Sequence, residues 1–176
     1  CGRQGVFYQN LADGPPTIDL DANDSTGATG ADFKGNFAGN GAIVPAADTD
    51  TLITDNGNTI SSGVIKLTTR PDGKSETLLL DTALAASRGI SVASDGNGGF
   101  SLSGAASLAD YQAVIATLQY ANALAFPTST DRVIAVTVND GVSDSNTAVS
   151  RLSYLQGLDE TVYKYLYLSD PGQGMD

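Results

Sequence analysis

Glycine-containing turn signals recur along the middle of this chain, between residues 40 and 141. Each is an asparagine or aspartate followed directly by glycine, which can adopt the positive φ angle that tight hairpin turns require. Turns at this close spacing allow short strands between them but not long helices, so they predict an all-β sandwich or barrel. The signals are Asn40-Gly41, Asn56-Gly57, Asp72-Gly73, Asp95-Gly96, Asn97-Gly98 and Asp140-Gly141.

Segments with alternating or short apolar runs lie between these signals and predict strands. The clearest segment is 132–139, which is rich in β-branched residues and therefore belongs at the centre of a sheet. The other candidate strands are 16–20, 42–46, 51–54, 63–69, 76–81, 90–93, 99–103, 117–121 and 146–154. The expected core side chains are Val64, Leu67, Leu78, Leu80, Leu102, Leu118, Ile134, Val136 and Val138.

One segment, 107–115, has a helical pattern instead. Ser107 can cap a helix, Asp110 lies in the first turn, and the apolar residues recur at helical spacing. We therefore expect one short helix between the strands, and no other.

The composition excludes several classes of function. Only Glu76 and Glu160 are glutamates among 20 acidic residues, so 18 are aspartates, which suit turns and hard-cation sites. A formal net charge of −11 disfavours nucleic acid and anionic lipid as partners, and no apolar run approaches the length of a membrane span. The chain has no histidine for a catalytic triad, and nearly all its acids lie beside polar loop residues, so we expect no enzyme and no catalytic residues.

The aspartates cluster in a way that suggests a calcium site. Asp19 and Asp21 alternate along one segment, Asp48 and Asp50 along another, and Asp140 follows the clearest strand. Carboxylates at positions i and i+2 of an extended segment project to the same side, where they could bind Ca²⁺ with loop carbonyls and water. The alternative is that these aspartates are solvated turn and edge residues.

Both ends of the chain differ from its middle. We expect a lead-in segment at 1–14, a β-sandwich at 15–154 and a C-terminal strand and tail at 155–176. In the tail, residues 161–168 alternate strictly, with tyrosines on one face and mainly aliphatic residues on the other. This strand could pair with an edge of its own sandwich or with a neighbour's edge, or the tail could be a disordered end or the start of another domain.

Cys1 is the only cysteine, so the chain can form no intramolecular disulfide. The sequence Cys1-Gly2 could follow cleavage of a lipoprotein signal, which would place a lipid anchor on Cys1. A fragment boundary or an intermolecular thiol is the alternative that we favour.

The order of these pieces resembles the cadherin-like, immunoglobulin-fold repeats of large bacterial surface adhesins, including those with RTX-type secretion. The likeness covers about residues 15–154. The segments that carry it are 18–33, 42–50, 53–55, 73–78, 102–104, 108–113, 118–122 and 132–141.

The resemblance implies an immunoglobulin/cadherin-like Greek-key sandwich in a secreted or surface-displayed protein. It implies a non-catalytic adhesive module stabilised by Ca²⁺ through Asp19, Asp21, Asp48, Asp50 and Asp140, whose partners are adjacent repeats, neighbouring copies and host or matrix ligands. The alternative is a self-assembling subunit of an extracellular fibre, joined by exchange of terminal strands. A polysaccharide-binding module is a more distant alternative, because the chain has no tryptophan.

Overall fold

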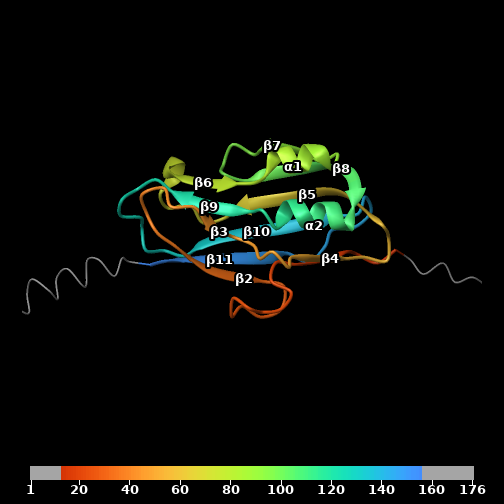
Figure 1. Cartoon of the computed structure of the whole chain (residues 1–176), viewed down its shortest axis with the longest axis horizontal. Helices are drawn as coiled ribbons and strands as arrows, with labels where there is room; N and C mark the ends of the chain where they lie inside the picture. The colour runs from red at the N-terminus through yellow and green to blue at the C-terminus, as the bar shows by residue number, and fades with distance from the viewer. Residues whose placement is uncertain (1–12, 156–176) are drawn as a thin grey trace, which may run out of the picture.

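The computed structural model describes residues 13–155, of which 41% lie in strands and 12% in helices (Figure 1). The chain is therefore mostly β, as the turn signals predict. The strands are β1 (Thr17–Asp19), β2 (Phe33–Phe37), β3 (Val44–Pro45), β4 (Leu52–Thr54), β5 (Thr59–Leu67), β6 (Glu76–Leu79), β7 (Ser91–Ser94), β8 (Phe100–Ser107), β9 (Gln119–Asn122), β10 (Arg132–Asn139) and β11 (Ala148–Tyr154).

The largest sheet has six strands in the order β2-β11-β10-β5-β8-β7. Its neighbours are antiparallel except for β2 and β11, which run parallel. β10 lies between β11 and β5, which confirms the prediction that residues 132–139 occupy the centre of a sheet. Side chains of β10 alternate between buried and half-buried positions, because successive residues of a strand point to opposite faces.

A second layer covers one face of the six-stranded sheet (Figure 1). It contains the three-stranded sheet β3-β9-β6, the two-stranded β1-β4 ladder and two helices. Tyr120 of β9 and Leu78 of β6 belong to the same buried cluster as Ile134 of β10. The hydrophobic core therefore lies between the two layers.

Helix α2 (Leu108–Ile115) confirms the helical prediction for 107–115. The hydroxyl of Ser107 accepts a hydrogen bond from the backbone N–H of Asp110 at 3.1 Å, and Tyr111, Val114 and Ile115 are buried. This capping bond satisfies one of the backbone donors that a helix leaves free in its first turn.

The expectation of a single helix is wrong, because a second helix, α1 (Thr82–Ser87), precedes β7. The Asp81 carboxylate caps α1 by accepting the N–H of Leu84 at 2.8 Å. Six residues are too few to show a helical period in the sequence.

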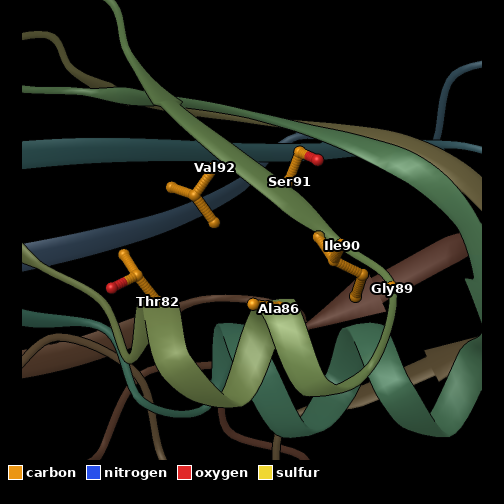
Figure 2. Close-up of a pocket in the computed structure, with 6 residues that line it drawn as sticks. All are labelled: Thr82, Ala86, Gly89, Ile90, Ser91 and Val92. Atoms are coloured by element: carbon orange, nitrogen blue, oxygen red, sulfur yellow. The ribbon is translucent and has the colours of Figure 1, made fainter.

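A short 3₁₀ helix, η1 (Gly73–Ser75), precedes β6. Helix α1 and strand β7 diverge from their junction at Gly89 (Figure 2).

Most of the expected core side chains are buried, but Val64 is not. Val64 is 38% exposed and lies beside exposed Lys66, whereas its neighbours Ile65 and Leu67 are buried. The period of two along β5 therefore places Val64 on the solvent face. Leu80 follows β6 and is half-buried. The buried members of the expected set are Leu67, Leu78, Leu102, Leu118, Ile134, Val136 and Val138.

Only part of the turn prediction is confirmed. The signals at 95–98 and 140–141 join antiparallel neighbours, β7 to β8 and β10 to β11. Those at 40–41, 56–57 and 72–73 connect strands of different sheets, because the chain crosses there between layers. The sequence also gave no indication of β2, whose centre is polar and contains Gly35, although Phe33 and Phe37 at its ends are buried.

The first and last described residues lie at opposite ends of the molecule (Figure 1). Strand β11 runs toward the end at which the described part of the chain finishes. The proposed strand at 161–168 and most of the expected lead-in lie outside the described residues. None of the helices in residues 13–155 is long and apolar enough to cross a membrane.

Candidate metal-binding clusters

The β1-β4 ladder has an acidic cluster at each end. The ladder contains the pairs Thr17–Thr54, Ile18–Ile53 and Asp19–Leu52. Asp13 precedes β1 and Asp55 follows β4, so both lie at one end, where Asp140 joins them from the end of β10. We call this group the Asp55 cluster. The chain segments at the other end bring together Asp21, Asp48 and Asp50, which we call the Asp21 cluster.

The spacing of both clusters suits a hard cation. In each cluster, one carboxylate oxygen per residue lies within 4.8 Å of the others. Two oxygens that each lie about 2.4 Å from a calcium ion are at most about 4.8 Å apart, so the spacing in both clusters meets this condition for a shared ion.

The Asp55 cluster has several carboxylate oxygens without a hydrogen-bond donor. Both Oδ1 and Oδ2 of Asp55, and Oδ2 of Asp140, are buried and have no hydrogen-bond partner among the described residues. An unpartnered buried carboxylate oxygen is costly, and nearby carboxylates add repulsion. No ion pair within residues 13–155 involves Asp13, Asp55 or Asp140. A cation would satisfy these oxygens.

The other oxygen of Asp140 holds the β10–β11 turn. Its Oδ1 accepts the backbone N–H groups of Val142 and Ser143, both at 2.7 Å. These hydrogen bonds, from Ser143 first and then Val142, lower the pKa of Asp140 below its ordinary value. The turn thus favours the ionised carboxylate, while Oδ2 receives no hydrogen bond from the described part of the chain.

Gly57 leaves room for the Asp55 cluster. A Cβ at this position would lie 2.9 Å from Oδ2 of Asp55 and within 3.7 Å of both carboxylate oxygens of Asp13. The first distance is too short for a real contact, so any larger residue would displace the carboxylate of Asp55. Glycine therefore allows the two acids to approach.

The Asp21 cluster is largely satisfied by the protein itself. Asp21 is fully buried, and Ser25 and Thr26 donate to it through both backbone N–H and hydroxyl groups. Burial raises the pKa of Asp21, but the hydrogen bonds from Thr26 and Ser25 outweigh it, and the net pKa is lowered. Asp48 accepts the hydroxyl of Ser25, and Oδ2 of Asp50 accepts the N–H of Asn23. In this cluster, Oδ1 of Asp50 is the one buried carboxylate oxygen that has no partner within residues 13–155.

The structure therefore divides the five predicted metal ligands. Asp21, Asp48 and Asp50 come together, and Asp140 belongs to the Asp55 cluster. Asp19 belongs to neither cluster, and its Oδ1 accepts the backbone N–H of Asp21 at 3.0 Å.

Two residues of the Asp55 cluster, Asp13 and Asp55, are not among the five ligands that the sequence predicts. Asp13 lies in the expected lead-in segment 1–14, and Asp55 enters the sequence interpretation only through the segment 53–55, which contributes to the family resemblance. Their positions are the one signal that could have identified them. Asp13 precedes β1 and Asp55 follows β4, the strand that pairs with β1.

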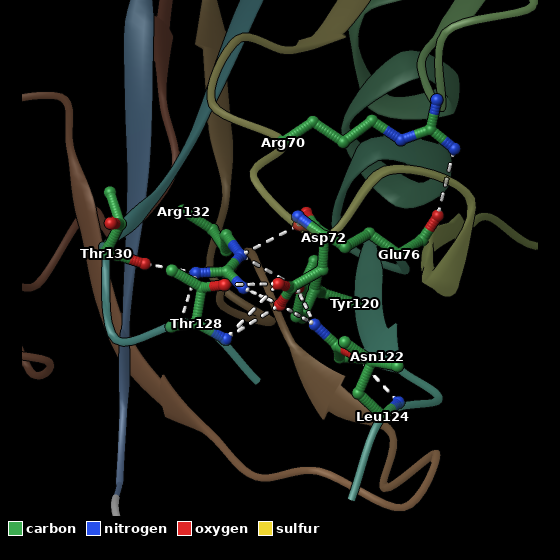
Figure 3. Close-up of polar contacts among 9 residues, drawn as sticks. All are labelled: Arg70, Asp72, Glu76, Tyr120, Asn122, Leu124, Thr128, Thr130 and Arg132. Atoms are coloured by element: carbon green, nitrogen blue, oxygen red, sulfur yellow. Dashed lines mark hydrogen bonds and ion pairs between the residues drawn. The ribbon is translucent and has the colours of Figure 1, made fainter. Parts of the chain in front are cut away.

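A third polar cluster lies at the loops that precede β6 and β10 (Figure 3). Arg132 is fully buried and forms ion pairs with Asp72 and, at 3.2 Å, with Glu76. Its Nε also donates to the hydroxyl of Tyr120 at 3.1 Å, and its guanidinium lies 4.8 Å from the ring centre of Phe37. Arg132, Glu76 and Tyr120 are buried, so the cluster joins the two layers from within.

Asp72 is the acceptor at the centre of this cluster. It receives hydrogen bonds from Thr128 and from the amide of Asn122, the latter at 2.9 Å. Burial raises the pKa of Asp72. The hydrogen bonds from Thr128 and Asn122 and the charge of Arg132 lower it by more, so the net pKa is below its ordinary value. Asp72 is therefore an ionised structural residue.

Comparison of the chain with protein-family models, with curated proteins and with solved structures finds no match.

Proposed function

We propose that residues 15–154, together with Asp13 just before them, form a calcium-stabilised, non-catalytic structural and adhesive module of an extracellular surface protein. The proposed architecture is an immunoglobulin/cadherin-like Greek-key sandwich. The observation that carries the calcium hypothesis is the set of buried, unpartnered oxygens of Asp55 and Asp140. Adjacent repeats or neighbouring copies are the expected partners, together with host or matrix ligands.

Calcium fits the donor set better than other common metals. The Asp55 cluster offers only carboxylate oxygens, and calcium accepts oxygen ligands in flexible geometry. Three carboxylates supply part of a shell of about six to eight oxygens, and water would supply the rest because Asp13 is exposed. The chain has no histidine and its one cysteine is Cys1, so neither residue type could contribute to this cluster.

The placement of the cluster supports a role in a tandem or end-to-end arrangement. The described part of the chain begins with Asp13 and finishes with Leu155, and it begins and finishes at opposite ends of the molecule (Figure 1). A cation shared by Asp13, Asp55 and Asp140 would tie the incoming chain to β4 and β10. It would therefore stiffen this end of the module.

The arrangement of the acids supports the absence of catalysis. A carboxylic acid that transfers protons near neutral pH needs a raised pKa, which apolar burial provides. Asp21, Asp72 and Asp140 instead have lowered pKa values because hydrogen bonds favour their charged form. They suit structural or cation-binding roles.

Thermal unfolding with and without calcium tests the proposal. We expect millimolar calcium to raise the melting temperature of the full chain relative to chelator, because a ligand that binds only the folded state stabilises it, by about 2.7 kcal/mol at 100 times its dissociation constant. Asp55→Asn should remove most of this gain. It should also make the protein at least as stable as the wild type in chelator, because it removes a repelling charge.

Asp24→Asn is the matched control. It removes the same charge from an exposed residue that belongs to neither cluster, and asparagine tolerates the positive φ angle of 53° there. This variant should keep the full calcium gain. Identical wild-type melting curves in calcium and chelator, together with no heat of calcium binding by titration calorimetry, would refute the proposal.

A further inference from the structure

The six-stranded sheet ends in a short edge strand, β7, whose outer edge pairs with no other strand of residues 13–155. β7 has the sequence Ser91-Val92-Ala93-Ser94, with no charged residue and no proline. Proteins commonly place lysine, proline or a bulge on an exposed edge strand to prevent pairing with another chain. Ser91, Ala93 and Ser94 are exposed. This edge is therefore open to an added strand.

The hydrogen-bond pattern identifies the free backbone groups. The N–H of Asp95 donates to the carbonyl of Gly99 at 3.0 Å, so this pair is a hydrogen-bonded one. In an antiparallel ladder, hydrogen-bonded and non-hydrogen-bonded pairs alternate. The pairs Ser94–Phe100 and Val92–Leu102 are therefore non-hydrogen-bonded. It follows that Val92 and Ser94 direct their N–H and C=O groups away from β8, toward the open edge.

A groove of about 460 Å³ runs along this edge, between β7 and helix α1 (Figure 2). The helix contributes Thr82 and Ala86, and the strand side contributes the consecutive residues 89–92. Gly89 and Ile90 form the connection from α1, but Ser91 and Val92 are successive residues of β7 and point to opposite faces, so both can line one groove only if the backbone edge between them faces it. The groove therefore has a backbone edge on one side and a helix on the other, which is the arrangement that binds extended peptides by strand addition.

The chain contains a segment that matches this groove. Residues 161–168 alternate strictly, with Tyr163, Tyr165 and Tyr167 on one face and Val162, Lys164, Leu166 and Leu168 on the other. A strand added to β7 would place one face beside half-buried Val92 and the groove side of α1, and the other beside exposed Ser91 and Ala93. The mainly aliphatic face suits the first environment and the tyrosine face suits the second.

Chain length argues that the segment comes from a second copy. A strand added outside β7 lies five inter-strand spacings from β11, which is about 24 Å. The six Cα steps from Leu155 to residue 161 span at most about 21 Å when fully extended. A tail that leaves at the end of β11 therefore falls short of its own β7, but a neighbouring molecule's tail has no such limit.

We propose that the groove between α1 and the edge of β7 accepts residues 161–168 of a second copy of this chain as an added strand. The contact joins a tail to a distant edge, so it is head-to-tail and can propagate into a filament. The proposal goes beyond calcium stabilisation and does not depend on it, since neither acidic cluster includes a residue that lines the groove.

Val92→Pro in the full chain is the first test, made in a Cys1→Ser background that removes disulfide dimers. Proline removes the N–H that faces the open edge, but leaves the ladder to β8 intact because Val92 is not hydrogen-bonded to it. Sedimentation velocity should show concentration-dependent association of the parent and a monomer for Val92→Pro. Val92→Thr, which keeps the N–H, should associate like the parent.

A second pair of variants tests the helix side of the groove. Ala86→Arg fills the groove with a long side chain, whereas Ala83→Arg places the same side chain on an exposed helix position outside the groove. Arginine is a good helix former, so both variants should fold. We expect association to be lost in Ala86→Arg and kept in Ala83→Arg.

A labelled synthetic peptide of residues 159–170 provides a direct measurement. The host is the full-length Leu166→Asn variant, in which the protein's own tail should bind the groove less tightly and so compete less with the peptide. The peptide should bind this variant, and adding Ala86→Arg to it should reduce the binding at least tenfold. A parent protein that stays monomeric at all concentrations and does not bind the peptide would overturn the proposal. Association that persists unchanged in both Val92→Pro and Ala86→Arg would also overturn it.

Discussion

The side-chain amide of Asn146 takes the place of a neighbouring strand for Ile18. The N–H of Ile18 donates to Oδ1 of Asn146, and Nδ2 of Asn146 donates to the carbonyl of Ile18, both at 2.9 Å. On the other side of the ladder, the N–H of Ile53 donates to the side chain of Gln112 in α2. Side-chain amides therefore connect both outer edges of the β1-β4 ladder to the rest of the fold.

Asn146→Ala should destabilise the protein by about 2 to 4 kcal/mol, because two buried backbone groups of Ile18 lose their partners. Asn146→Asp should also destabilise it at neutral pH, since a carboxylate can accept from the N–H but repels the carbonyl. Chemical denaturation of both variants measures the free energy of unfolding. Asn58→Ala, at an exposed position, serves as control and should change little. A loss below about 0.5 kcal/mol in Asn146→Ala would show that water replaces the amide.

Gly57→Ala should weaken calcium stabilisation without removing any carboxylate. The new Cβ would lie 2.9 Å from Oδ2 of Asp55 and must displace it. We expect calcium affinity to fall about tenfold, which reduces the gain in unfolding free energy by about 1.4 kcal/mol. Gly14→Ala is the control, because a Cβ there meets nothing within 4 Å. Equal calcium affinity for both variants would mean that no ion occupies the Asp55 cluster.

Asp72→Asn should lower stability by about 3 kcal/mol at neutral pH, because it leaves the buried guanidinium of Arg132 without one of its carboxylates. The pH dependence gives a second readout. The pKa of Asp72 is lower in the folded state than its ordinary value of 3.8. Its contribution to stability is therefore complete above pH 3.8 and is lost as the pH falls through the folded value.

Stability measured against pH should accordingly fall less steeply on the acid side in Asp72→Asn than in the wild type. Asp131→Asn, which affects only an exposed ion pair with Arg151 at 3.9 Å, should keep the wild-type slope. Parallel acid curves for the wild type and Asp72→Asn would contradict the role that we assign to Asp72.

Two tyrosines should ionise only at strongly alkaline pH. Burial raises the pKa of both Tyr111 and Tyr120 to about 12. Because the folded value lies above the ordinary value of 10.0, their contribution to stability is present below pH 10.0 and is lost as the pH rises toward 12. The absorbance of tyrosinate near 295 nm should therefore show a late phase that coincides with unfolding by circular dichroism. Tyr111→Phe should reduce that phase, and an early titration of all tyrosines would contradict the burial.

The features that could be predicted from the sequence are those that local patterns encode. The period of two in β10 and the Ser107 cap of α2 are local, and both were recognised correctly. Strand β2 was not, because its pairing with β11 joins segments more than a hundred residues apart and its centre is polar.

The candidate metal site likewise combines residues that a local pattern identifies with residues that only long-range strand pairing brings together. Asp21, Asp48 and Asp50 could be selected because two of them share an Asp-x-Asp spacing and all lie in acidic loops. Asp13 and Asp55 join Asp140 only through the pairing of β1 with β4, which no local pattern indicates. Asp72 was expected to lie in a hairpin turn, but its partner Arg132 is distant in sequence and draws it into the interior.

The position of β11 between β10 and β2 determines how the module would respond to mechanical load. Tension applied at Leu155 along β11 would shear two ladders at once, of five residue pairs each. The first strand, β1, is held by only three pairs and by the amide of Asn146. We therefore expect the molecule to yield first at its N-terminal end, with β1 detaching while β11 remains seated in the sheet.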